Sequence, residues 1–285
     1  MTTASLPTVS GAPLATGAVA KLRWALADAW TVTRRNLIAY TRIPEALFFS
    51  TIQPVMFVLL FRFVFGGSIG HFTAAEGIPY PDYLMAGIFV QTMAFGSVST
   101  SVGLAEDLQK GIIERFRALP MARSAVLAGR TTADLIRNVL VALIITGVGF
   151  AVGFRITTGV PEFLGGVALT LLFAYALSWG FAVIGLSASN SETAQVMAFP
   201  LLFPLTFASS AFVPVNTMPG WLQGFANHQP VSIVINAARS LMAGPKAAHL
   251  AGSTTTSLVI QAVIWCLVLL AVLAPLAVWR YRSRT

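Results

Sequence analysis

Residues 163–187 read FLGGVALTLLFAYALSWGFAVIGLS, an unbroken run without a single charged side chain. A helix needs about 20 consecutive apolar residues to cross the roughly 30 Å hydrocarbon core of a bilayer. The run meets that requirement and therefore predicts a transmembrane helix.

Comparable apolar runs occur along the rest of the chain. Only 10% of its 285 residues are charged and its mean hydropathy is +0.78, whereas a soluble domain carries about 25% charged residues. We therefore predict an all-α polytopic membrane protein with six transmembrane helices. The predicted spans are residues 47–65, 83–104, 135–154, 163–187, 196–213 and 258–279.

The placement of basic residues predicts the orientation. All but four of the 18 Lys and Arg residues lie before the first span, between the second and third spans, or after the last. Basic residues concentrate on the cytoplasmic side of membrane proteins, so we expect a multi-pass protein of the cell membrane with both termini in the cytoplasm. This placement also accounts for the net charge of +8 without a nucleic acid partner. The four basic residues expected outside are Arg62, Arg155, Arg239 and Lys246.

The first 43 residues contain a tail and an amphipathic helix. Residues 1–20 lack the basic and apolar regions of a signal peptide and are predicted to be a flexible N-terminal tail. In residues 22–43 apolar side chains recur every three or four positions, which predicts a helix lying in the membrane interface. Trp30 would lie at headgroup depth, with Arg34 and Arg35 near anionic lipid. A further contact of this helix with a cytoplasmic partner remains open.

Two segments between the spans have unusual composition. Residues 105–134 mix many charges with apolar residues, which predicts a short helix extending the second span as far as Pro120 and a docking surface for a soluble partner. Residues 214–240 are too apolar for a solvated loop and too short for another hairpin. They predict a re-entrant segment of half-helices, because irregular backbone at membrane depth must be covered by protein or line a cavity. Its marker residues are Pro214, Pro219, Trp221 and Pro230.

Several kinds of chemistry are missing from the sequence. It has no phosphate-binding loop for ATP and no motif of metal ligands, and we predict no catalytic residue. Residues 66–70 match G-x-S-x-G, but the preceding segment is a predicted membrane helix rather than a strand, so we interpret them as a flexible exit turn. The predicted spans hold almost no ionisable residues, which argues against ion-coupled transport.

Uncharged polar and aromatic residues within the spans are candidates for a substrate path. They could line a route for a bulky apolar molecule, or they could pack in the bundle and hydrogen-bond to other helices. The candidates are Phe89, Gln91, Phe95, Phe199, Phe203 and Phe207.

Three features of the sequence occur together in a characteristic order. The first is the basic amphipathic helix before the first span. The second is the segment from Glu106 to Gly111 followed by Glu114, Arg115 and Leu119-Pro120, and the third is the proline-rich stretch from Phe212 to Arg239. Together they resemble an ABC-2 type permease subunit of the daunorubicin-resistance exporter branch.

The resemblance implies a transmembrane domain over residues 21–285 that forms half of a transporter. A second permease subunit and two ATP-binding subunits would complete it, and ATP and Mg²⁺ would bind only to those subunits. The interfacial helix would form part of the gate, with Trp30, Arg34 and Arg35. The ATPase-coupling surface would consist of Glu106, Gly111, Glu114, Arg115, Leu119 and Pro120.

We therefore expect an exporter subunit, without enzyme activity of its own, that moves an amphipathic drug or lipid out of the cytoplasm or inner leaflet. Three alternatives stay open: a polysaccharide or glycolipid permease of the same fold, an ATP-independent carrier, and an intramembrane enzyme that uses Ser68. The choice between homodimer and heterodimer also stays open.

Overall fold

The computed structural model describes residues 18–42, 44–75, 77–119 and 121–283. Helices fill most of this part of the chain, and no strand occurs in it, so the predicted all-α class is confirmed. The elements are α1 (Ala18–Arg42), α2 (Pro44–Leu59), the π-helical turn η1 (Leu60–Val64), α3 (Gly66–Ala75), α4 (Tyr80–Gly96), α5 (Val98–Gln109), α6 (Ile112–Arg117), α7 (Arg123–Ala151), α8 (Val160–Ser187), α9 (Ser191–Phe207), the 3-10 turn η2 (Val215–Thr217), α10 (Gly220–His228), α11 (Pro230–Ala243), α12 (Pro245–Leu250) and α13 (Thr255–Ser283).

Within the described ranges, four helices are long and apolar enough to cross a membrane: Tyr80–Gln109, Ser124–Ala151, Val160–Ser187 and Thr255–Ser283. They correspond to four of the predicted spans. The predicted first span is the broken pair α2 and η1. The predicted fifth span extends too far, because α9 ends at Phe207 rather than at residue 213.

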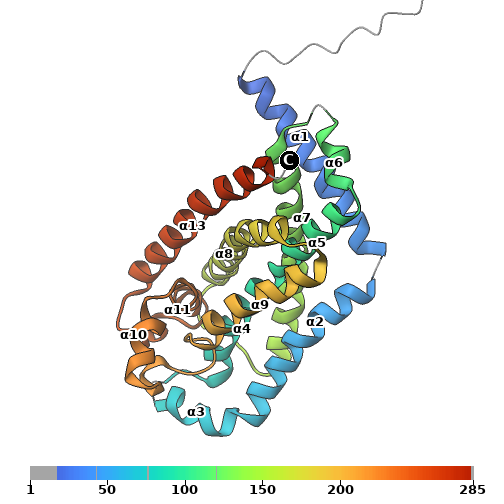
Figure 1. Cartoon of the computed structure of the whole chain (residues 1–285). Helices are drawn as coiled ribbons and strands as arrows, with labels where there is room; N and C mark the ends of the chain where they lie inside the picture. Colours follow the sequence, from blue (N-terminus) through green and yellow to red (C-terminus); the bar gives the residue numbers. More distant parts are fainter. Residues whose placement is uncertain (1–17, 43, 76, 120, 284–285) are drawn as a thin grey trace, which may run out of the picture.

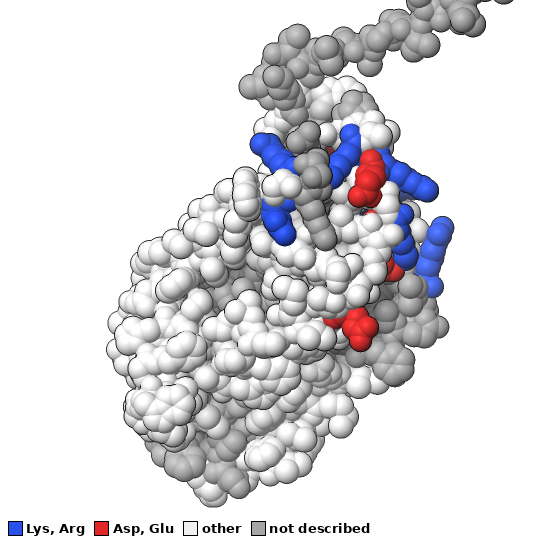
Figure 2. Space-filling view, in the orientation of Figure 1, with Lys and Arg blue, Asp and Glu red and all other residues white. Residues whose placement is uncertain are grey.

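The helices form one bundle with two distinct ends. In Figure 1, α8 runs through the middle, and the C-terminal end of α13 lies close to α1 and α6 at one end, while α3 and α10 lie at the other. Figure 2 shows that the charged side chains visible on this face gather at the end where α1 and α6 lie. Below them the visible surface carries hardly any charge, as expected for a surface solvated by lipid.

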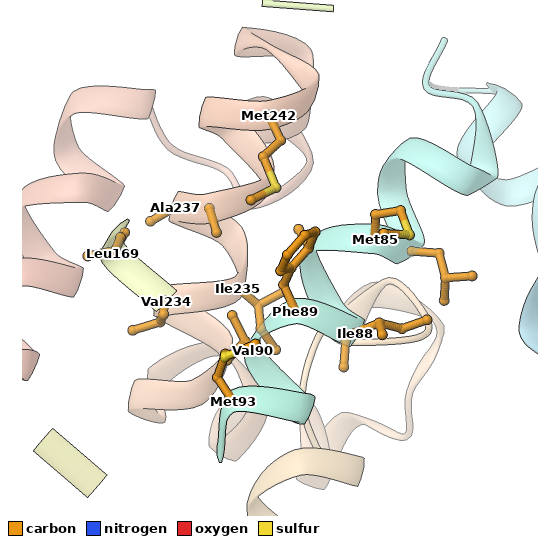
Figure 3. Packing of buried hydrophobic residues seen from close by; sticks show 14 of the residues in the cluster. Met85, Ile88, Phe89, Val90, Met93, Leu169, Val234, Ile235, Ala237 and Met242 are labelled. Atoms are coloured by element: carbon orange, nitrogen blue, oxygen red, sulfur yellow. The ribbon is translucent and has the colours of Figure 1, made fainter. Parts of the chain in front are cut away.

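The core lies where α4 and α11 meet. Met85, Phe89 and Met93 of α4 are fully buried. Phe89 and Met93 lie beside Val234 and Ile235 of α11 (Figure 3), whereas Met85 points away from them toward Gly149 of α7. The chain also approaches α4 closely elsewhere: a Cβ added to Gly87 would collide with the backbone of Ala211. Only glycine fits there.

Two expectations from the sequence are wrong in detail. Residues 66–70 were expected to form a flexible exit turn, but they open the helix α3, in which positions for an added Cβ at Gly66 and Gly70 both lie 3.7 Å from the Tyr80 side chain. Glycine has a low helix propensity, so the sequence alone does not predict this helix. The helix extending the second span ends at Gln109, before Pro120 is reached, and Gly111 follows with a left-handed φ of 65°. Arg239, one of the four basic residues expected outside, is only 2% exposed.

Candidate functional site

Residues 106–119 form an elbow at the charged end of the bundle. Helix α5 ends at Gln109, the chain reverses through Gly111, and α6 follows. Ile113 anchors α6 because it is fully buried in a cluster with Leu104 of α5 and Tyr281 of α13.

The elbow collects most of the predicted coupling residues on one surface. Gly111 is its turn, Glu106 forms an ion pair of 2.5 Å with Lys110, and Leu119 is exposed. Glu114 and Arg115 also face solvent. Pro120 lies outside the described residues. The surface therefore presents both charge signs and an apolar side chain to whatever lies beyond this end.

Helix α1 is bound to the elbow through Arg35. The Arg35 guanidinium donates a hydrogen bond of 2.6 Å to the Asp107 carboxylate and lies 5.1 Å from the ring centroid of Phe116. The other two predicted gate residues, Trp30 and Arg34, are exposed. Helix α1 thus has one face fixed to α5 and α6 and another open to its surroundings.

A buried polar network lies deeper along α1. Asp134 of α7 is fully buried and accepts hydrogen bonds from Tyr40 and from Thr100, the latter of 2.5 Å. Arg130 completes it with an ion pair of 3.5 Å to Asp134. Burial, followed by the charge of Asp134, raises the pKa of Tyr40 to about 12. The network joins α1, α5 and α7, and no local sequence pattern predicts it, because Tyr40 and Thr100 are 94 and 34 positions away from Asp134.

A cavity of about 500 Å³ opens beside this network, between α2, α4, α5, α7 and α9. It lies at the break between α4 and α5, where Ser97 separates the two helices after Gly96. Gly/Ser pairs are a recognised cause of helix kinks. Gln91, Phe95 and Phe199 of the predicted path line the cavity.

Arg137 of α7 stabilises the break and lines the same cavity. Its Nη2 donates hydrogen bonds to the Gly96 carbonyl at 2.7 Å and to Asn138 Oδ1 at 3.2 Å. Its guanidinium also lies 5.8 Å from the ring centroid of Tyr40, which connects the cavity to the buried network. Sequence reasoning missed Arg137 as a site residue and counted it as a topology signal.

The remaining predicted aromatics extend from the cavity as a ladder of ring contacts. Phe95 and Phe199 contact Phe203, and Phe203 stacks on Phe207 with centroids 5.3 Å apart. The ladder continues through four rings that are not among the predicted path residues: Phe57, Phe61, Phe65 and Phe212. The first three recur at four-residue spacing, a pattern that is visible in the sequence. Phe89 is not part of it, because it is buried against Phe163 in the core.

The predicted re-entrant stretch consists of two short helices, α10 and α11, with a sharp corner at Gln229. The Gln229 amide donates hydrogen bonds of 2.8 Å to the Leu205 carbonyl and 2.9 Å to the Ala208 carbonyl at the end of α9. Pro214, Pro219 and Pro230 stand at or next to the first residues of η2, α10 and α11, as suits a residue without an amide donor. Trp221 of α10 is 81% exposed.

Arg239 holds this stretch to the rest of the bundle. Its guanidinium donates to the carbonyls of Tyr83 and Ser210 at 2.9 and 2.5 Å and lies 3.6 Å from the Tyr83 ring centroid. These contacts satisfy the arginine through carbonyl oxygens and a ring face.

The other chemistries considered from the sequence find little support in the geometry. In the part of the chain that the structure describes, no group of three or more His, Cys, Asp or Glu side chains could hold a metal ion. The G-x-S-x-G match at residues 66–70 opens α3 and follows the helical turn η1, whereas a hydrolase elbow follows a strand.

Comparison with known proteins identifies the family. The profile of the ABC-2 type transporter family matches residues 27–243. The chain is 33% identical to the daunorubicin resistance ABC transporter permease protein DrrB1 of Streptomyces coeruleorubidus, over 88% of this chain and 84% of that one. It is 27% identical to the probable doxorubicin resistance ABC transporter permease protein DrrC of Mycobacterium tuberculosis, over 75% and 76%, and 25% identical to the inner membrane transport permease YadH of Escherichia coli K12, over 66% and 73%. The chain is therefore a multi-pass membrane permease that belongs to the ABC-2 type transporter family.

Proposed function

We propose that this permease exports an amphipathic drug or lipid through the cavity beside Gly96 and the aromatic ladder, driven by ATP-binding partner subunits. The observation that carries the proposal is that the cavity and the aromatic ladder are continuous. The cavity mixes apolar and polar lining, and Phe95 and Phe199 belong both to its wall and to the ladder. Relatives of this chain are named as drug resistance ABC transporter permease proteins, which supports export of a drug-like molecule.

The proposed topology has six spans, with α2 and η1 as the first and α9 as the fifth. Because α9 has only 17 residues, it extends about 25 Å and needs the corner at Gln229 to cover its end. In this topology α10 and α11 re-enter the outer leaflet, and the charged end of the bundle with both termini faces the cytoplasm. The gathering of charges in Figure 2 supports this orientation.

The proposed coupling uses the elbow as the docking surface for an ATP-binding subunit, which would hold the ATP and Mg²⁺. Movement of the elbow would pass to α1 through Arg35 and Asp107, and from α1 to the cavity through Tyr40, Asp134 and Arg137. Each of these contacts joins two helices, so a displaced elbow has a continuous packed route to the cavity. A second permease subunit completes the translocation path in this proposal.

The test combines purification with transport. The tagged chain is purified from native membranes with its associated proteins and reconstituted into inside-out vesicles, and ATP-dependent accumulation of the neutral fluorophore N-phenyl-1-naphthylamine is measured. We expect an ATP-binding subunit to co-purify and accumulation to require ATP. Accumulation that persists without ATP or that subunit would favour a standalone carrier, and transport confined to glycan substrates would favour a polysaccharide permease.

A further inference from the structure

We infer that the cavity beside Gly96 takes an amphipathic ligand whose polar end is an anionic hydrogen-bond acceptor, a carboxylate or a phosphate. This inference rests on the proposed function, since it assigns the ligand class of the same cavity. It follows from the lining, which has an aromatic part formed by Phe57, Phe95 and Phe199 and a polar part that includes Gln91 and Arg137.

The polar part presents hydrogen-bond donors that lack acceptors. Gln91 is only 3% exposed, and its Nε2 has no hydrogen-bond partner. The Nε of Arg137 is likewise buried and without a partner. A buried donor without an acceptor is costly, and a donor that carries charge more so. Both orphaned atoms are donors, and both belong to side chains that line the cavity.

The charge of the cavity has one sign. Arg137 is the one charged side chain among the described residues that line it. Asp134 is one helical turn away, but its carboxylate oxygens are occupied by Tyr40, Ser99 and Thr100 and by the ion pair with Arg130. Arg137 itself bonds to a carbonyl and an amide oxygen and forms no ion pair with a described residue. Its charge therefore remains available to a ligand.

Low local dielectric strengthens this preference. An anionic group meeting a guanidinium away from bulk water forms a short, charge-assisted hydrogen bond, whereas a cationic group of the same shape meets a like charge. The aromatic part accepts the apolar body of either ligand. Discrimination between the two ligands accordingly falls on Arg137, with Gln91 adding a second donor.

The experiment uses a matched pair of probes on the purified permease in nanodiscs of zwitterionic lipid. 9-Anthracenecarboxylate and 9-(aminomethyl)anthracene share one ring body and differ in charge, and their dissociation constants are measured by fluorescence titration. We expect the carboxylate to bind about 10- to 100-fold more tightly, the range that one charged hydrogen bond supplies. Displacement of the bound carboxylate probe by oleoyl lysophosphatidic acid would identify a lipid phosphate as a source of the ligand. If the lipid does not displace the probe, the ligand is instead a free carboxylate compound.

Three variants separate this inference from its alternatives. Arg137→Gln should abolish the charge preference, Arg137→Lys should retain it in weaker form, and Gln91→Met should weaken only the carboxylate, by about threefold to tenfold. Arg282→Gln, an exposed arginine of α13 outside the cavity, serves as the control and should change nothing. Equal binding of both probes would overturn the inference, and so would a charge preference that survives Arg137→Gln in a monodisperse protein. Either result would still support the cavity as a binding site, without a preference set by Arg137. Absence of binding by both probes would reject the cavity itself and with it the proposed path.

Discussion

The guanidinium of Arg35 and the carboxylate of Asp107 form a 2.6 Å ion pair that joins α1 to the elbow. Asp107 is 13% exposed and Arg35 35%, so the pair is partly shielded from solvent and stronger than a typical surface ion pair. Phe116 lies against the same guanidinium. One arginine thus connects α1 to both helices that flank the turn at Gly111.

Loss of this ion pair should uncouple ATP hydrolysis from transport. We expect Arg35→Gln and Asp107→Asn each to reduce ATP-dependent transport about threefold to tenfold, with ATP hydrolysis by the assembled complex retained, because the partner still docks but α1 no longer follows the elbow. The measurement is transport and hydrolysis in the same vesicles. Arg23→Gln, an exposed arginine near the start of α1, is the matched control. A double variant whose fold-loss equals the product of the two single fold-losses would contradict a direct interaction.

Glu114 should be needed for docking the ATP-binding subunit. It is exposed on α6, in the middle of the elbow, and an interface residue of this kind contributes about 5- to 30-fold in affinity when its contact is central. We expect Glu114→Ala to lower the yield of co-purified ATP-binding subunit by about that factor while membrane insertion stays normal. Glu162→Ala at the start of α8 provides an exposed glutamate away from the elbow. Normal ATP-dependent export by a stable Glu114→Ala protein would remove the residue from the docking surface.

Much of the fold follows from the length of apolar runs alone. A run such as 163–187 needs no tertiary contact to become a helix in lipid, since every backbone donor and acceptor is satisfied within it. The short α9 and the broken first span are harder to predict, because their ends depend on Gln229 and on ring contacts supplied by other helices. The helix at 66–75 could not be predicted from its three glycines, because glycine has a low intrinsic helix propensity.

The candidate site likewise contains some residues that local sequence pattern predicts and others that depend on tertiary contacts. Helical periodicity separates the predicted path residues: Gln91 and Phe95 are four residues apart and share a face, while Phe89 points elsewhere, toward the core. This spacing alone distinguishes Phe89 from Gln91 and Phe95 in the sequence. The contact of Tyr40 with Asp134 joins residues 94 positions apart, and no local pattern predicts it.

Gly87 should be intolerant of any side chain. A Cβ there would collide with the backbone of Ala211, which cannot move as a flexible side chain could. We expect Gly87→Ala to cost about 1–3 kcal/mol of stability through overpacking, seen as a fall of several degrees in the melting temperature by circular dichroism in detergent. Gly147→Ala on α7, where nothing lies within 4 Å of the added Cβ, should be neutral or slightly stabilising. Equal melting temperatures for the two variants would refute the close approach of α4 to residue 211.

Phe203 should be needed for transport but not for assembly. Its ring contacts Phe95, Phe199 and Phe207, so its removal takes away one of two connections between the cavity and the far rings, the other being Phe57. An aromatic pair contributes about 0.5–1.5 kcal/mol, and we expect Phe203→Ala to slow transport of N-phenyl-1-naphthylamine about threefold to tenfold. Phe150→Ala removes a ring on α7 that is 40% exposed and stacks on Phe154, outside the ladder. Equal effects of the two variants would argue against a route along the rings.

Tyr40 should couple stability to alkaline pH. Burial and the neighbouring Asp134 raise its pKa from 10.0 to about 12, so the folded protein holds this proton more tightly than the unfolded chain does. The resulting stabilisation is fully present below pH 10 and is lost as the pH rises from 10 to about 12. Tyr40→Phe removes this contribution together with the hydrogen bond to Asp134, and we expect it to cost about 1–3 kcal/mol at neutral pH. Melting temperatures of the wild type and Tyr40→Phe should therefore converge between pH 10 and 12, and a gap that stays constant across that range would show that Tyr40 does not hold its proton through Asp134.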